Sequence, residues 1–264
     1  MVRNLTRAKI PALKGAQIFR ADIRDSEAIR SSIKDCDAVI HFAAILGNKP
    51  NSWADFRSVN VEGTRLLAEA AIEAKVKKFV YVSAVWVYGL NAKPGTNEKS
   101  PRRFSNDPYS DTKLEAENII LELCHKKGLP AIIVQPTYVY GPGDETWTLT
   151  PIKLVRNHLL FLPEGGNGLM QPVFIDDLVD GIMAAFFHGK IGNSYILCGP
   201  EVVIVKEFFT YLAHMIGKTT IPSIPGWIAL LMAQVLELVS RFGRYSIPFT
   251  RCSAWMVNEG HLQL

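Results

Sequence analysis

The sequence has few cysteines, almost no net charge and no export signal at its start. Its four cysteines lie too far apart for a zinc knuckle or a CxxC redox pair, and no metal site is expected from them: Cys36, Cys124, Cys198 and Cys252. The 29 Lys and Arg residues against 25 Asp and Glu leave a formal net charge of only +4, so no nucleic-acid partner is indicated. We expect a cytoplasmic protein with reduced thiols.

The sequence also lacks a long uninterrupted apolar run. The longest, 224–239, contains Gln234 and Glu237 and is shorter than the roughly 18 apolar residues of a membrane span. Helical spacing places Gln234, Glu237, Arg241 and Arg244 on one face. The opposite face is apolar, with Ile228, Leu231, Met232, Val235 and Leu238. We favour a helix that docks this face on the protein's own core. The alternatives are contact with a membrane surface through 224–243, or a dimer.

What is present is enough apolar material for a large core, since 48% of the residues are hydrophobic. Up to about residue 142, short apolar runs alternate with amphipathic patterns. Strands are predicted at 16–21, 37–42, 78–83 and 131–135, and helices at 26–34, 55–75 and 107–127. Apolar strands separated by helices predict an α/β fold with a parallel sheet covered on both faces.

The pattern changes after Pro142. Residues 143–172 are rich in Gly and Pro and contain one short helical segment, 150–158. Helices at 176–188, 205–216 and 227–242 and a strand at 194–198 follow. We interpret 1–142 as the main domain, to which 172–200 returns, and 143–171 with 201–264 as a smaller lid.

Tyr109 and Lys113 are four residues apart at the start of a predicted helix, so they share one helical face. A phenol has a pKa of about 10, and an ammonium group one turn away lowers that value. Such a tyrosine can exchange a proton with a substrate oxygen near neutral pH. The spacing alone is weak evidence, because a surface tyrosine beside a solvated lysine has the same pattern.

Five segments in order give the pair its context: VIHFAA at 39–44, NVEGT at 60–64, FVYVSAVWVYG at 79–89, PYSDTKLEAE at 108–117 and PTYVYGPGD at 136–144. Together they resemble the extended short-chain dehydrogenase/reductase superfamily, within it the NAD(P)-dependent epimerase/dehydratase group. Members like 3β-hydroxysteroid dehydrogenase and dihydroflavonol reductase look most similar. The resemblance covers about residues 1–220 and implies a doubly wound, Rossmann-like sheet with a small C-terminal substrate-binding lid.

The resemblance implies roles for individual residues. Tyr109 would be the catalytic acid and base, and Lys113 would tune it and hold the nicotinamide ribose. Asn60 would support the strand ends near the cofactor. The other implied cofactor contacts are Asp22 and Ile23 at the adenine, Phe42, Ala43 and Ala44 at the adenine ribose and phosphates, and Pro136, Thr137 and Val139 at the carboxamide. His41 is interpreted as a packed histidine rather than a base.

The sequence departs from the family pattern in two places. The glycine-rich GxxGxxG turn that cradles the pyrophosphate is absent, and residues 2–4 match the end of the family's second strand. We therefore expect a truncated sheet without its first strands, inactive alone, with a GxxGxxG within about 40 residues before Met1. The usual catalytic hydroxyl is also replaced by Ala84. Ser83 could substitute for it, Thr137 could help, or the site is weakened.

Three functions compete at this point. The favoured one is an NAD(P)-dependent oxidoreductase acting on a hydroxyl or ketone of an apolar, sterol-, flavonoid- or terpenoid-like small molecule. The second is a nucleotide-sugar epimerase or dehydratase, and the third a non-catalytic cofactor-binding or regulatory relative. Arg3 favours NADP over NAD, because an arginine near the end of the second strand can pair with the 2′-phosphate. The resemblance also implies a homodimer.

Overall fold

The computed structural model describes residues 15–46, 52–90 and 92–243. Its main sheet is parallel throughout, with the strand order β1-β2-β3-β8. Every residue of β3 is buried, as expected for a strand covered on both faces. The four strands are β1 (Ala38–His41), β2 (Lys78–Val82), β3 (Ala131–Pro136) and β8 (Ser194–Leu197).

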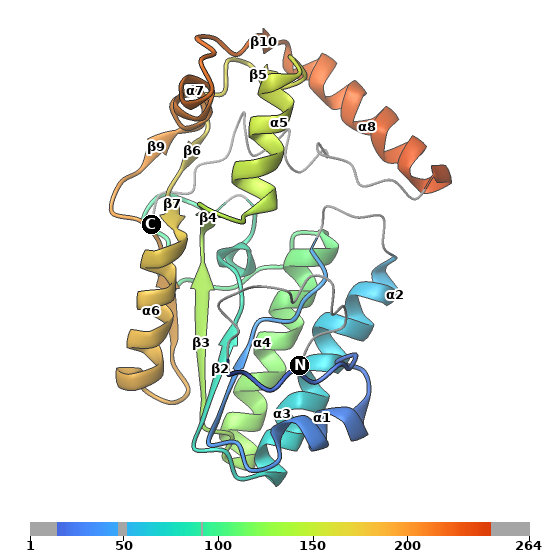
Figure 1. Cartoon of the computed structure of the whole chain (residues 1–264), viewed down its shortest axis with the longest axis vertical. Coiled ribbons are helices and arrows are strands. Elements are labelled where there is room, and N and C mark those ends of the chain that lie inside the picture. Colours follow the sequence, from blue (N-terminus) through green and yellow to red (C-terminus); the bar gives the residue numbers. More distant parts are fainter. Residues whose placement is uncertain (1–14, 47–51, 91, 244–264) are drawn as a thin grey trace.

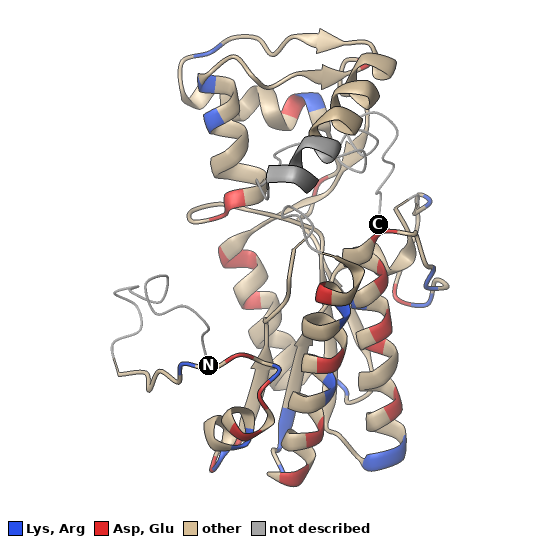
Figure 2. Ribbon diagram, turned by 90° about the vertical axis from the view of Figure 1, so that its right-hand side faces the viewer, with Lys and Arg blue, Asp and Glu red and all other residues tan. Residues whose placement is uncertain are grey.

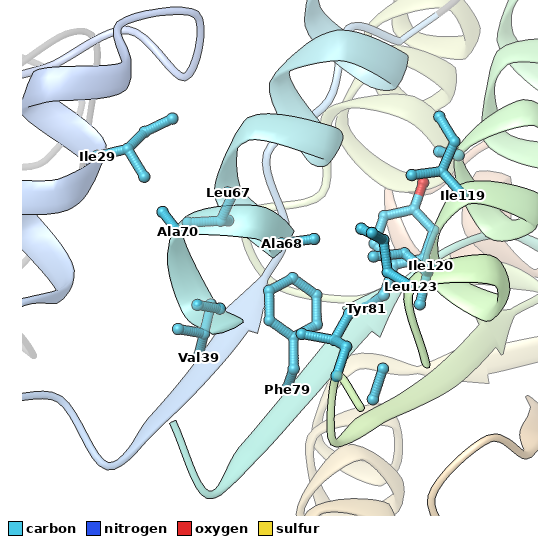
Figure 3. Packing of buried hydrophobic residues seen from close by; sticks show 14 of the residues in the cluster. Ile29, Val39, Leu67, Ala68, Ala70, Phe79, Tyr81, Ile119, Ile120 and Leu123 are labelled. Atoms are coloured by element: carbon cyan, nitrogen blue, oxygen red, sulfur yellow. The ribbon is translucent and has the colours of Figure 1, made fainter. Parts of the chain in front are cut away.

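Helices cover both faces of this sheet, which confirms the doubly wound α/β fold (Figure 1). On one face the core includes Phe79 and Tyr81 of β2 together with apolar residues of three helices (Figure 3). On the other face Val80 of β2 packs with Leu178 and Ile182 of a fourth helix. The first three helices are α1 (Ser26–Ile33), α3 (Gly63–Glu73) and α4 (Pro108–Lys127), and the fourth is α6 (Ile175–His188).

The helix predicted at 55–75 is built from three consecutive pieces. The four-residue α2 (Trp53–Phe56) begins with a capping box between Ser52 and Asp55, and it continues into the π-helical turn η2 (Arg57–Glu62) and then α3. A π-helical turn is rare and marks functional positions more often than chance. Gly63 follows it, and a Cβ there would lie 2.7 Å from Cγ2 of Ile23, so glycine allows this close approach.

A second core lies beyond the ends of the main strands. There Tyr88, Leu114, Met170 and Phe209 pack together with neighbouring apolar side chains. Its short strands pair as β4 with β7, β5 with β10 and β6 with β9. The elements are η3 (Val85–Tyr88), β4 (Tyr138–Tyr140), η4 (Glu145–Leu149), α5 (Thr150–Arg156), β5 (Leu162–Pro163), β6 (Leu169–Met170), β7 (Pro172–Phe174), β9 (Val203–Ile204), α7 (Val205–Met215), β10 (Ser223–Ile224) and α8 (Gly226–Gly243).

Charged residues gather on helices and loops rather than on the main strands (Figure 2). Strands β1, β3 and β8 contain no Asp, Glu, Lys or Arg, and β2 has only Lys78 at its start. The Lys78 Nζ donates to the carbonyl of Phe186 at 2.6 Å, near the end of α6. The sheet interior is thus apolar, as the uninterrupted hydrophobic runs predicted.

The prediction of a strand at 16–21 is wrong. Only Arg20 forms an isolated bridge, and residues 15–18 are exposed. An apolar run becomes a strand when a partner takes its hydrogen bonds and covers its side chains, and these side chains remain in solvent. The first helix starts where it was predicted and is capped by Asp25, whose carboxylate accepts from the amides of Glu27 and Ala28.

The predicted packing face of the last helix is wrong as well. Among residues 226–236, whose side chains the structure describes, Ala229 and Ala233 are buried, whereas Leu231 and Val235 are more than half exposed. Leu238 of the predicted face lies outside this range. The helix therefore contacts the rest of the protein through its small residues and presents larger apolar ones to solvent. Among the described residues no helix is long and apolar enough to cross a membrane.

Candidate active site

The carboxyl ends of β1, β2 and β3 lie next to one another because the strands are parallel neighbours. Residues after these ends therefore share one edge of the sheet, where ligands bind in open α/β folds. Phe42 and Ala43 after β1 are exposed, whereas Ser83 and Ala84 after β2 and Thr137 after β3 are buried. The structure thus brings most of the predicted site residues to one edge.

Helix α4 carries the tyrosine and the lysine to this edge. Its first residue, Pro108, has the fixed backbone angle that helix starts favour, and the Asp107 side chain accepts from the Ser110 amide at 2.8 Å. Since α4 connects two parallel strands, it runs back along the sheet and begins at their carboxyl ends. Tyr109 and Lys113 lie in its first two turns.

Lys113 is almost completely buried, with 2% of its surface exposed. Its Nζ donates to the carbonyl oxygen of Val82 at 2.7 Å and lies 4.3 Å from the ring centroid of Tyr81. Burial lowers the pKa of Lys113 to about 7, although the Glu117 carboxylate opposes the shift. The ammonium is therefore fixed at the end of β2 and is easily deprotonated.

The phenol of Tyr109 differs from the expectation. Its pKa is raised to about 12, first because burial disfavours the phenolate and then because Asp107 is negatively charged. The lowering expected from Lys113 is not found, since the ammonium is held by Val82 and the Tyr81 ring. In this state Tyr109 holds its proton and can donate it, but it is not prepared to accept one.

Two hydroxyls were left open as replacements for the one missing at Ala84, and their surroundings differ. The Ser83 Oγ is buried and makes no hydrogen bond. The Thr137 hydroxyl donates to the carbonyl of Gln171 at 2.6 Å and lies 3.4 Å from that of Leu197. Ala84 is 5% exposed. A buried polar atom without a partner is unfavourable unless a ligand completes it, so Ser83 is the candidate whose hydroxyl is available.

Asn60 lies in the π-helical turn and connects two parts of the edge. Its Oδ1 accepts from the Ile45 amide at 2.7 Å, and its Nδ2 donates to the Ile45 carbonyl and to Thr112 Oγ1 of α4. The segment after β1 is therefore fixed to the helix that carries Tyr109 and Lys113. Its role near the cofactor, which the resemblance implied, stays a prediction.

The residues predicted at the adenine lie beside the start of α1. Both oxygens of the Asp22 carboxylate accept from the Arg24 guanidinium at 2.8 Å. The Ile23 side chain belongs to the apolar core. Arg3, on which the NADP prediction depends, lies outside the described residues.

His41 is buried at the end of β1, as interpreted from the sequence. The Thr64 hydroxyl donates to the Asn60 carbonyl and accepts from His41 Nε2 at 2.8 Å. Burial and the charge of Lys113 lower the His41 pKa to about 3, so the ring is neutral at physiological pH. In the part of the chain that the structure describes, no cluster of His, Cys, Asp or Glu could hold a metal ion.

Sequence reasoning missed a buried polar group one turn beyond Lys113. Glu117 is completely buried and forms an ion pair with Arg102, with Nε and Oε2 2.6 Å apart. Gln135 of β3 donates to both Glu117 oxygens and accepts from the Tyr88 hydroxyl. The i, i+4 spacing between Lys113 and Glu117 was the available signal in the sequence. The partners of Glu117 lie 15 and 18 residues away, and no sequence pattern connects them with it.

The residues at this edge fit a nicotinamide dinucleotide, because Ser83 offers a buried hydroxyl without a partner and Lys113 a fixed cation. Fold and site define the class of Rossmann-like enzymes that act with such a cofactor. The model of the NAD-dependent epimerase/dehydratase family matches residues 1–198, and the chain belongs to this family.

Its relatives catalyse different reactions. A Stigmatella aurantiaca enzyme named 4-hydroxy-2-methyl-3-oxo-4-farnesyl-3,4-dihydroquinoline-1-oxide ketoreductase is 27% identical, covering 91% of this chain and 73% of its own length. Isoform 2 of the Arabidopsis thaliana 3β-hydroxysteroid dehydrogenase/decarboxylase is 26% identical, over 84% of this chain and 42% of its own. The chain thus spans under half of that plant enzyme.

Among solved structures, a Bacillus cereus UDP-glucuronic acid 4-epimerase in complex with NAD matches with a TM-score of 0.74. The two sequences are 25% identical, and the match covers 84% of this chain and 74% of the epimerase. This similarity confirms the Rossmann-like fold class. The chain therefore belongs to a family of NAD-dependent enzymes that includes oxidoreductases. The members of this family differ in substrate.

Proposed function

We propose that the protein is an NAD(P)-dependent oxidoreductase that acts on a hydroxyl or ketone of an apolar small molecule. The observation that carries the proposal is the buried Lys113 ammonium, held at the end of β2 one helical turn from Tyr109. The cofactor supplies or accepts the hydride when it is bound. The chain supplies the proton and orients the substrate oxygen.

In the reducing direction, Tyr109 donates its proton to the substrate oxygen, and its raised pKa keeps that proton available at neutral pH. The Ser83 hydroxyl donates a hydrogen bond to the same oxygen, which completes its own hydrogen bonding. Lys113, held one helical turn away, would contact the nicotinamide ribose. Asn60 fixes the segment after β1, along which Phe42, Ala43 and Ala44 would contact the cofactor.

The apolar substrate class is supported by the side chains of the second core. Partly buried Trp86, Trp147, Ile152 and Leu160 pack around it, and Leu159 is 60% exposed. An apolar molecule gains free energy by covering such surface. Nucleotide-sugar epimerisation or dehydration is the second candidate, favoured by the match to the UDP-glucuronic acid 4-epimerase.

The test is Tyr109→Phe in the active protein, with Tyr211→Phe as a control because Tyr211 is 71% exposed on α7. We expect Tyr109→Phe to abolish most turnover and to leave cofactor binding nearly unchanged, since only the transferable proton is removed. Reduction of a ketosteroid is followed by nicotinamide absorbance. Conversion of a UDP-sugar is followed by chromatography of the products, because epimerisation and dehydration return the cofactor to its starting oxidation state. Equal turnover in both variants would remove Tyr109 from its role, and turnover of the UDP-sugar alone would favour the second candidate.

We further propose NADP as the preferred cofactor, which rests on Arg3 in the sequence. Arg3→Ala should weaken NADPH binding far more than NADH binding, because a guanidinium pairs with phosphate through two hydrogen bonds. Calorimetric titration with both cofactors measures this difference. An equal effect on both would return NAD to the favoured position.

A further inference from the structure

Three aromatic rings from separate elements of the second core pack against one another: Trp86 of η3, Tyr138 of β4 and Trp147 of η4. The Tyr138 ring lies in the middle, with its centroid 5.1 Å from that of Trp86 and 4.9 Å from that of Trp147. Both indoles stand at 84° to it, which is the edge-to-face arrangement that aromatic pairs favour. We call these three residues the aromatic triad, and the proton transfer proposed above does not use them.

The backbone brings the triad to the edge of the sheet where Ser83 lies. Trp86 follows Ser83 by three residues, in the short η3 turn that begins directly after Ala84. Tyr138 follows Thr137 at the end of the neighbouring strand. Strands β2 and β3 are parallel, and the contact between the Trp86 and Tyr138 rings joins the segments that leave their two ends. The triad is thus built onto the segments that carry Ser83 and Thr137.

The triad is held in place by its surroundings, and part of its surface remains open. Tyr138 is 3% exposed, whereas both indoles are only partly buried. The Asp144 carboxylate accepts from the Trp147 amide at 2.7 Å and fixes the start of η4. The Gly141 amide donates to Thr148 Oγ1 at 3.0 Å, so η4 is attached to the segment directly after β4. A ligand would therefore meet indole surface that is already ordered, which lowers the entropic cost of binding.

Such a surface selects ligands by rigidity and polarity. A fused ring system covers an aromatic side chain without losing torsional freedom, while an open chain must first be ordered. Ile152 and Leu160 pack against the same core, and their side chains offer no hydrogen bond to the hydroxyl groups of a sugar. The triad therefore favours an apolar ring system over an open chain and over a sugar.

We propose that Trp86 and Trp147 are specificity-determining residues that bind the ring system of an apolar substrate, with Tyr138 between them as their support. The substrate class proposed above thereby narrows to ring-bearing ketones and alcohols, and open-chain compounds are disfavoured. This inference rests on the proposed function for the reaction at the substrate oxygen, which Ser83 and Tyr109 would contact. Its test measures binding and does not require turnover.

The experiment measures the quenching of tryptophan fluorescence when the full chain is titrated with a ketosteroid, with a straight-chain ketone and with a UDP-sugar. Trp86→Phe and Trp147→Phe each remove one indole and keep an aromatic ring. Trp227→Phe is the matched control, because Trp227 is 68% exposed on α8. We expect the ketosteroid to quench the parent protein and the control alike. Each triad variant should lose part of this quenching and the double variant most of it, since the quenched indoles are gone.

Trp86→Leu separates ring recognition from packing. Leucine keeps apolar bulk without a ring, so the dissociation constant of the ketosteroid should rise about tenfold and that of the straight-chain ketone much less. Trp86→Phe should retain most of the affinity. If Trp86 served only the second core, Trp86→Leu would lower the unfolding temperature and leave the affinity for the ketosteroid unchanged. Calorimetric titration and thermal unfolding measure the two effects.

Trp86→Leu removes a ring that packs on Tyr138 and can unfold the chain for that reason, so Trp147→Leu is the second variant and the two phenylalanine variants keep the test valid. The proposal would be overturned by an absence of ketosteroid quenching in the parent protein, by equal quenching in the parent and the double phenylalanine variant, or by quenching with the UDP-sugar alone. An equal loss of affinity for both ketones would overturn it as well.

Tyr109→Phe distinguishes this inference from the proposed function. The variant keeps the triad and should bind the ketosteroid as the parent protein does. Unchanged turnover in Tyr109→Phe would contradict the proposed reaction and leave the quenching by Trp86 and Trp147 in place. A loss of turnover without any ketosteroid quenching would contradict the ring site alone.

Discussion

The Ser83 hydroxyl is buried without a partner, whereas the Thr137 hydroxyl is bound by backbone carbonyls. We therefore predict that Ser83→Ala lowers turnover on the order of ten- to hundredfold, which corresponds to about 1–3 kcal/mol for one oriented hydrogen bond. Stability should change little, because no hydrogen bond of the protein is lost. Steady-state kinetics and thermal unfolding measure the two effects.

Ala84→Ser is the companion variant to Ser83→Ala. If position 84 were the place from which a side-chain hydroxyl contacts the substrate oxygen, the new serine would raise turnover. Because Ser83 already presents an unpaired hydroxyl and Ala84 is 5% exposed, we expect no gain and a loss of stability from a second buried polar group. A rise in turnover would reassign the hydroxyl to position 84.

At the residue scale, the sequence led to positions whose neighbours are local and missed those whose neighbours are distant. Tyr109 and Lys113 were found because one helical turn separates them. Glu117 lies in the same segment, yet its partners Arg102 and Gln135 are distant in the sequence and only the fold brings them to it. The raised pKa of Tyr109 was missed for a similar reason, since burial and not spacing decides it.

At the element scale, Gly128 ends α4 with a left-handed backbone, φ 69°, and its amide donates to the Leu123 carbonyl. Nothing lies within 4 Å of a Cβ built there, so a substitution acts through the backbone alone. We predict that Gly128→Ala lowers the free energy of unfolding by about 1 kcal/mol, and that Gly128→Asn lowers it less. Chemical denaturation of the three proteins measures this, and equal stability would show that the helix end adapts.

The sequence predicted elements best where packing and local pattern agree. Strands β2 and β3 were found almost to the residue, because their apolar runs are bounded by loops and buried by neighbours on both sides. Residues 16–21 have a similar pattern and form no strand. In α8 the apolar pattern fixed the helix but not its contact face, since Ala229 and Ala233 pack closely and larger residues do not.

At the scale of the whole molecule, the candidate site lies where two cores meet. Strand β3 belongs to the sheet, and after it Thr137 leads directly into β4, where Tyr138 joins the second core. The Thr137 amide and hydroxyl bind carbonyls of Leu197 and Gln171. These hydrogen bonds connect the segment after β3 with Gln171 and with the end of β8, so the second core is fixed to the sheet at this point.

Burial of Lys113 also makes the stability of the whole molecule depend on pH. Its pKa is about 7 in the folded protein and 10.5 as an ordinary side chain, so between these values the unfolded chain binds a proton that the folded protein has released. The free energy of unfolding should therefore rise with pH in this range, by up to about 1.4 kcal/mol per pH unit. Below about pH 7 both states are protonated, and the burial of the charge is fully unfavourable.

Lys113→Met isolates this contribution. The variant fills a similar apolar volume without a titrating group, so its advantage in stability over the parent protein should be largest below pH 7 and shrink toward pH 10. Denaturation with urea at a series of pH values measures the difference, in which other groups cancel, including Cys198 and the tyrosines with raised pKa values. A constant difference across the range would mean that Lys113 titrates normally, so that its ammonium is solvated rather than buried at the end of β2.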